Sequence, residues 1–92
     1  MAVFVMLTVD LNRGVTEEAR DKFNEALKQE QWTKLTLTTT WYAKFKEGVT
    51  EAGALDTTKV DVTNAASHAG ITNYEVAAIP STSMPTIWNH LR

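Results

Sequence analysis

The sequence predicts one small α+β domain, built from an antiparallel four-stranded sheet with two helices on one of its faces. Ninety-two residues suffice for a single domain, which we place at 1–92 with an extended tail over 80–92. Hydrophobic residues make up 43% of the chain, as in ordinary globular proteins. Short β-rich runs alternate with two helical patterns, and this alternation predicts the fold class.

The first strand is expected at Val3–Leu11, because this run is rich in β-branched residues and too short for a typical helix. Alternation places a fully apolar set on one face, namely Val3, Val5, Leu7, Val9 and Leu11. The other face carries Phe4, Met6, Thr8 and Asp10. Both faces are largely apolar up to Asp10, which predicts a central strand with something covering each side.

A helix is expected to begin at Thr16, a good N-cap residue, and to end near Gln31. Glu17 and Glu18 lie at the positive end of its dipole. Its apolar stripe consists of Val15, Ala19, Phe23, Ala26 and Leu27. Trp32 is expected to pack beneath the last turn.

The segment Lys34–Lys46 favours strand, since it is rich in threonine and aromatic residues. It fits either one long bent strand or two short strands broken around residues 38–40. Val49–Leu55 is expected to form a loop or a small hairpin arm.

We expect Asp56 to cap a second helix that runs from Thr57 to about Ala69 and stops at Gly70. Its buried stripe would be Val62, Ala65, Ala66 and Ala69. The last strand is expected at Tyr74–Ile79. The extended tail that follows carries Ile87, Trp88 and Leu91.

The order β-α-β(β)-α-β predicts the ferredoxin-like arrangement βαββαβ, with both helices on the Val3/Val5/Leu7 face. The opposite face is then bare, although small monomers seldom expose a contiguous apolar patch. We therefore predict a homodimer whose interface includes Phe4, Met6, Thr8 and, from the tail, Trp88. The alternative is that the tail folds back over the face of its own chain.

The charge balance argues against a broad phosphate-binding surface, because nine Lys and Arg are set against eleven Asp and Glu. Nucleic acid stays possible as a partner, with Arg13, Lys34 and Lys44 as the candidate contacts. Lysines in this region are also typical of a solvated strand edge. The longest apolar stretch, Ala2–Leu7, is too short to cross a bilayer. We expect a cytoplasmic protein with no membrane partner and, without cysteine, no disulfide or thiolate site.

Asp10 is the one candidate for chemistry, as the only acidic residue in an otherwise apolar strand. It could accept backbone hydrogen bonds in the following turn. It could instead bind a metal, since a dimer can present two copies of this carboxylate near its axis and Mg²⁺ takes one or two carboxylates with several waters. Neither His68 nor His90 has a partner at ligand spacing.

The succession of "VDLN", a helix, "TTTWYAKF", a second helix, "YEVAAIPS" and "IWNHL" resembles the small CRISPR-associated Cas-two proteins and their VapD-like relatives, in particular the stand-alone members. The resemblance implies a ferredoxin-like fold, sheet-to-sheet dimers and a metal-binding aspartate across the dimer axis. In this chain the resemblance assigns the metal-binding role to Asp10, and Thr40-Trp41 matches the family's motif in the second strand. The arginines at the start of the first helix are reduced here to Arg13 and Arg20.

Three classes of function follow. The first in rank is a non-catalytic dimeric interaction or regulatory module of nuclease-like ancestry, favoured by the acidic balance. The second is an endonuclease acting on RNA or DNA through Asp10 as the catalytic residue at the dimer axis, with Mg²⁺ or Mn²⁺ as cofactor. The third is a dimeric α+β barrel that binds a small ligand between sheet and helices, for which the polar candidates are Asp10, Thr8 and the threonines of 36–40.

Overall fold

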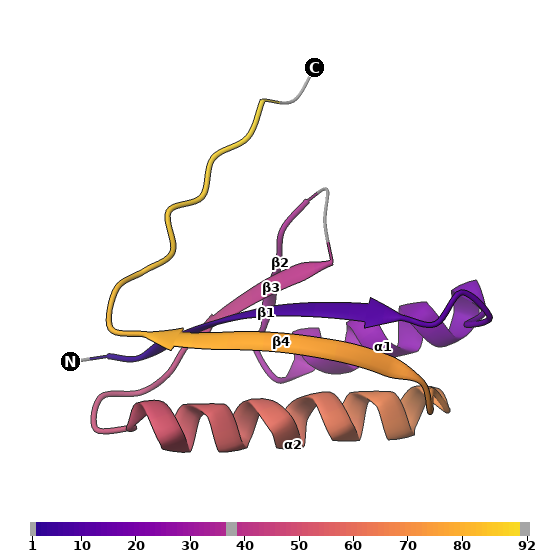
Figure 1. The fold of residues 1–92 in the computed structure, drawn as a ribbon, viewed down its shortest axis with the longest axis horizontal. Helices are drawn as coiled ribbons and strands as arrows, with labels where there is room; N and C mark the ends of the chain where they lie inside the picture. Colours follow the sequence, from indigo (N-terminus) through magenta and orange to yellow (C-terminus); the bar gives the residue numbers. More distant parts are fainter. Residues whose placement is uncertain (1, 37–38, 91–92) are drawn as a thin grey trace.

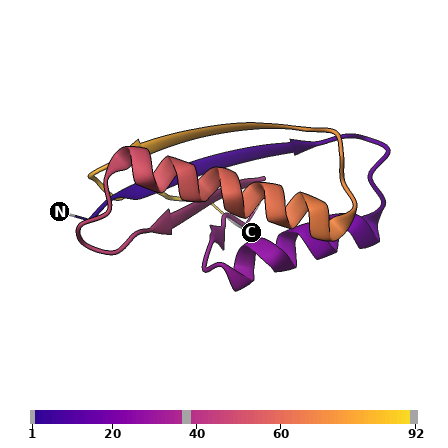
Figure 2. The same cartoon turned by 90° about the horizontal axis from the view of Figure 1, so that it is seen from below.

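The computed structural model describes residues 2–36 and 39–90. The chain forms one four-stranded antiparallel sheet, in the order β2-β3-β1-β4, with two helices against one face (Figures 1 and 2). The predicted α+β class and ferredoxin-like order of elements are confirmed. The elements are β1 (Phe4–Leu11), α1 (Glu17–Gln29), β2 (Thr33–Lys34), β3 (Thr40–Lys44), α2 (Glu51–Ala69) and β4 (Tyr74–Ser81).

β1 is a central strand, as its two-sided apolar pattern predicts. It pairs with β3 on one side and with β4 on the other. The face toward the helices is fully buried at Val5 and Leu7, which have no exposed surface. Together with Phe23 and Leu27 from α1 and Trp41 from β3, these residues are among the largest fully buried side chains of the core.

α1 begins as predicted, because the Thr16 side chain accepts a hydrogen bond from the backbone N–H of Ala19 at 3.1 Å. At the other end, Gln31 adopts a left-handed conformation with φ 69°. The N–H of Trp32 then donates to the Leu27 carbonyl at 3.1 Å, which closes the helix with a Schellman-type turn. After this turn the Trp32 side chain is 3% exposed, its ring lies edge-on to that of Phe45 and its Nε1–H donates to the Asp61 Oδ2 of α2 at 2.9 Å.

The predicted start of the second helix is wrong. α2 begins at Glu51, not at Thr57, and its N-cap is Thr50, whose side chain accepts from the N–H of Gly53 at 3.0 Å. Asp56 lies exposed inside the helix and caps nothing. Thr50 is also a favourable cap residue, although Asp ranks above Thr, and the low helix propensity of Gly53 in the first turn argued against the earlier start. The predicted stop is confirmed, since Gly70 is left-handed with φ 71°.

The segment predicted as either one bent strand or two short strands contains two strands, β2 and β3. Thr38 of the predicted break lies outside the described residues, as does Leu91 of the predicted tail. The last strand extends two residues past the predicted Ile79, through Pro80 to Ser81. β4 is an edge strand, where a sheet tolerates a proline.

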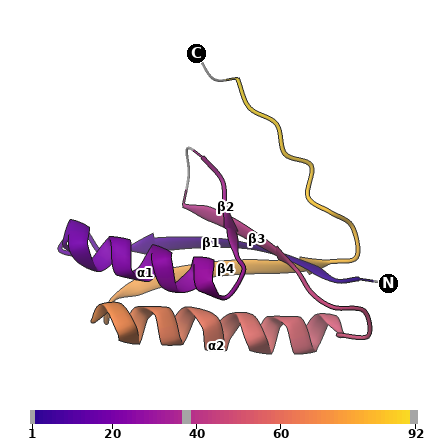
Figure 3. The same cartoon turned by 180° about the vertical axis from the view of Figure 1, so that it is seen from behind.

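The tail after β4 has no regular structure over residues 84–90. It stands away from the sheet on the side opposite the helices, the same side toward which the β2–β3 segment rises (Figures 1 and 3). Trp88 is 83% exposed there. In this structure the tail therefore does not fold back to bury its own apolar side chains against the sheet.

Candidate functional site

The sheet face that the helices leave uncovered is the candidate site, and we call it the open face. Side chains of residues paired in register point to the same side of a sheet. The even-numbered positions of β1 thus share this face with their partners on β3 and β4. Its members are Phe4, Met6, Thr8, Asp10, Thr40, Tyr42, Lys44, Glu75, Ala77, Ile79 and Ser81.

The middle of the open face is apolar. Met6 lies between its register partners Tyr42 and Ile79, which gives one row of large side chains across three strands. Ile79 is 64% exposed, although full burial of such a side chain is worth about 1.5–3 kcal/mol. The next row is small and polar, with Thr8 and Thr40 sharing a hydrogen bond of 3.2 Å between their hydroxyl oxygens.

The two ends of the open face carry opposite charges. Lys44 lies at the Phe4 end, with its Nζ 5.9 Å from the centroid of the Phe4 ring. Asp10 lies at the other end, directly opposite Glu75 in the register of β1 and β4. Like charges placed opposite each other in a sheet destabilise it by a few tenths of a kcal/mol. This pair of carboxylates therefore favours a positively charged partner.

The Asp10–Glu75 pair faces solvent beside a shallow depression of about 380 Å³, which Arg13 and Tyr74 also line. In the following turn the side-chain acceptor is Asn12, whose Oδ1 accepts from the N–H of Gly14 at 2.7 Å. Sequence reasoning missed Glu75, because only the register of β4 places it opposite Asp10. Within residues 2–36 and 39–90, no three His, Cys, Asp or Glu residues are grouped so that they could hold a metal ion.

The structure does not gather the predicted nucleic-acid contacts. Lys44 is on the open face, whereas Lys34 pairs with Trp41 and so belongs to the helix-covered side. The Lys34 Nζ donates to the Leu35 carbonyl at 3.2 Å. Arg13 follows β1 at the end of the strand opposite Lys44. No continuous basic surface results from these three residues.

The predicted interface residues do lie on one side of the molecule. Phe4 and Met6 are half-buried and Thr8 is exposed on the open face. The tail, with Trp88 and Ile87, lines a groove of about 590 Å³ together with Tyr42 and Leu35. The apolar middle of the open face, this groove and the tail lie on one side of the molecule and come from parts of the chain far apart in sequence.

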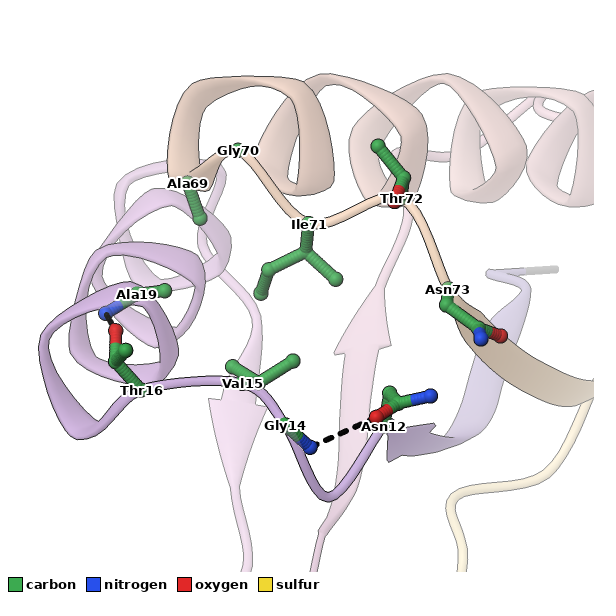
Figure 4. A pocket seen from close by; sticks show the side chains of 10 residues that line it. All are labelled: Asn12, Gly14, Val15, Thr16, Ala19, Ala69, Gly70, Ile71, Thr72 and Asn73. Carbon is green, nitrogen blue, oxygen red and sulfur yellow. Dashed lines mark hydrogen bonds between the residues drawn. The ribbon is translucent and has the colours of Figure 1, made fainter.

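A second hollow lies at the end of the sheet where the β1–α1 and α2–β4 connections meet (Figure 4). Val15 and Ile71 face each other across it, with small residues around them. Two of its four polar side chains, Asn12 and Thr16, accept hydrogen bonds from neighbouring backbone groups, as the dashed lines show, and the other two are Thr72 and Asn73. The turn at Asn12 and the helix cap at Thr16 therefore form one side of this hollow.

Asp10 and Thr8, predicted as polar candidates for a ligand between sheet and helices, lie on the open face instead. Comparison of the chain with protein-family models, with curated proteins and with solved structures found no match. The resemblance to Cas-two and VapD-like proteins therefore stays a prediction. Neither helix in the described part of the chain combines the length and hydropathy that a membrane span requires.

Proposed function

We propose that this protein is a non-catalytic interaction module that works as a homodimer, with the two open faces packed against each other. The supporting observation is the amount of surface that one chain exposes. A compact monomer of 10.2 kDa is expected to expose about 5,300 Å², whereas this chain exposes 6377 Å². The excess, about 1,000 Å², includes the surface of the extended tail and is of the same order as the roughly 800 Å² that each partner buries in a standard interface.

The shape of the chain agrees with this proposal. Its radius of gyration is 13.4 Å, against about 12 Å for a compact domain of this length. Much of the exposed apolar surface belongs to one side of the molecule, with Ile79 on the open face and Met84, Ile87 and Trp88 in the tail. A second copy seated on the open face lies within reach of this tail, which then serves as an arm.

Sedimentation or light scattering at micromolar concentration tests the proposal. The expected mass is twice the chain mass of 10.2 kDa. Ile79→Glu should yield monomers, because a carboxylate at the centre of the interface would be buried without a partner. The matched control is Val60→Glu on α2, since Val60 is 56% exposed but lies outside the open face.

Trp88→Ala tests the contribution of the tail separately. We expect this variant to dimerise with a higher dissociation constant than the wild type, but still to form dimers. Circular dichroism establishes that each variant is folded. A wild-type chain that stays monomeric at concentrations of tens of micromolar contradicts the proposal. A dimer that is equally insensitive to Ile79→Glu and Val60→Glu places the interface elsewhere.

A second candidate function is a metal-dependent endonuclease, and Glu75 is the observation that favours it. With Asp10 it supplies two carboxylates on one face, which is within the donor set that Mg²⁺ takes when it keeps several waters. Cleavage of labelled RNA and DNA with Mg²⁺ or Mn²⁺ tests this function. An endonuclease should lose activity in Asp10→Asn. Equal background cleavage by the wild type and by Asp10→Asn would contradict this function.

A further inference from the structure

The open face is polarised along the strands. Lys44 stands in the row of Phe4 and Ser81 at one end, and the carboxylates of Asp10 and Glu75 form the row at the other end. The face thus carries a positive end and a negative end, separated by six residues of β1. At about 3.3 Å per residue the two ends are about 20 Å apart.

The two central rows differ in size. Met6, Tyr42 and Ile79 make one row of large side chains, on β1, β3 and β4 respectively. The neighbouring row holds Thr8, Thr40 and Ala77 on the same three strands. On each strand a large side chain is therefore followed or preceded, two residues away, by a small one.

Two symmetric arrangements keep the strands of both sheets aligned. If the two-fold axis runs along the strands, each row meets the same row of the second copy. The carboxylates then meet carboxylates, and the large side chains collide while the small ones leave a gap. If the axis runs across the strands and passes between the two central rows, each row meets its opposite. The carboxylate end then faces the lysine end, and the large row faces the small row.

We infer that the two open faces pack antiparallel, so that Asp10 lies over the partner's Phe4, beside which the partner's Lys44 stands on the neighbouring strand. Each strand then lies over its own copy, with Met6 above the partner's Thr8 and Ile79 above the partner's Ala77. The ammonium group offsets the repulsion between two carboxylates that the monomer leaves opposite each other. The acidic pair becomes a docking point for a second copy of the chain.

This inference rests on the proposed homodimer and has a consequence for the second candidate function. The antiparallel arrangement sets the two copies of Asp10 at opposite ends of the interface, about 20 Å apart along the strands. One metal ion cannot be shared between them. The partner's Lys44 adds a positive charge near Asp10, and Arg13 of the same chain already lines the depression beside the carboxylates.

The salt dependence of dimerisation is the first test. In the antiparallel arrangement opposite charges attract, so the dissociation constant should rise severalfold between about 50 and about 500 mM sodium chloride as screening increases. When like ends meet, salt screens repulsion and the dissociation constant should fall. That second result would overturn the antiparallel arrangement and leave the homodimer standing.

Charge reversal gives a matched comparison. Lys44→Glu should weaken the dimer about tenfold, because it replaces attraction by repulsion at two symmetry-related places. Lys59→Glu changes the net charge equally but lies on α2, and its effect should be small. Equal effects of the two substitutions would contradict the inference. A chain that is monomeric without any substitution contradicts the proposed homodimer itself.

Cross-linking reads the orientation directly, since the chain has no cysteine of its own. Packed sheets lie about 10 Å apart, too far for a direct disulfide, so a short bis-maleimide reagent is used. The double variant Glu75→Cys/Ser81→Cys should give cross-linked dimers, because Glu75 lies over the partner's Ser81. Each single variant should not. Efficient cross-linking by Asp10→Cys alone would show instead that like ends meet.

Discussion

Replacing Gln31 by glycine should stabilise the protein. Gln31 is left-handed, with φ 69°, at the position after α1 where glycine is the usual residue. A side chain in this conformation costs about 1–2 kcal/mol, and the greater freedom of glycine in the unfolded chain cancels roughly 0.5–1 kcal/mol of that gain. We expect Gln31→Gly to raise the free energy of unfolding by about 0.5–1 kcal/mol.

For a domain of this size, that gain corresponds to an increase in Tm of about 2–8 °C, measurable by circular dichroism at one protein concentration. Glu30→Gly is the matched control one residue earlier, where φ is −87° and glycine brings only entropy loss. The control should lower Tm. If Gln31→Gly lowers it as well, the left-handed turn under Trp32 is not the native conformation.

Three further predictions concern the stability of the fold, each measured by urea unfolding. Asp61→Ala should lower the free energy of unfolding by about 1.5–3 kcal/mol, because the Asp61 Oδ2 accepts a 2.9 Å hydrogen bond from the buried Trp32 indole. Asp61→Asn keeps an acceptor and should lower it less. Thr50→Ala should lower the free energy of unfolding by about 1 kcal/mol, and Asp56→Ala by less than about 0.5 kcal/mol. The reverse order of these two losses would mean that α2 begins at the predicted position, Thr57. Leu7→Ala should cost about 2–5 kcal/mol, since Leu7 has no exposed surface, and a smaller loss would show that the site collapses around the cavity.

The elements with strong local signals were predictable. The alternation in β1, the cap at Thr16 and the stop at Gly70 are each set by residues within one turn or one strand, and the structure confirms them. The start of α2 was predicted wrongly, because Thr50 and Asp56 are both good caps and local preference does not choose between them. Packing is consistent with the earlier start, since Ala54, which lies in the turns that the prediction left out, is fully buried.

The candidate site was predictable in part. The Phe4 and Met6 face of β1 and the apolar tail could be read from the chain, because strand alternation and composition are local properties. The opposition of Asp10 and Glu75, and the rows of large and small side chains, could not. They depend on which strands pair and in what register, and β4 joins β1 from more than sixty positions away in the chain.

The sequence by itself determined the class of fold, the central strand and the existence of one apolar face without a helix to cover it. Those features follow from hydrophobic periodicity, which each segment carries alone. Only the tertiary structure decided what that face contains, with Lys44 at one end, two carboxylates at the other and Ile79 between them. The reason is physical: a strand sets the direction of its own side chains, but its neighbours on the sheet come from long-range pairing.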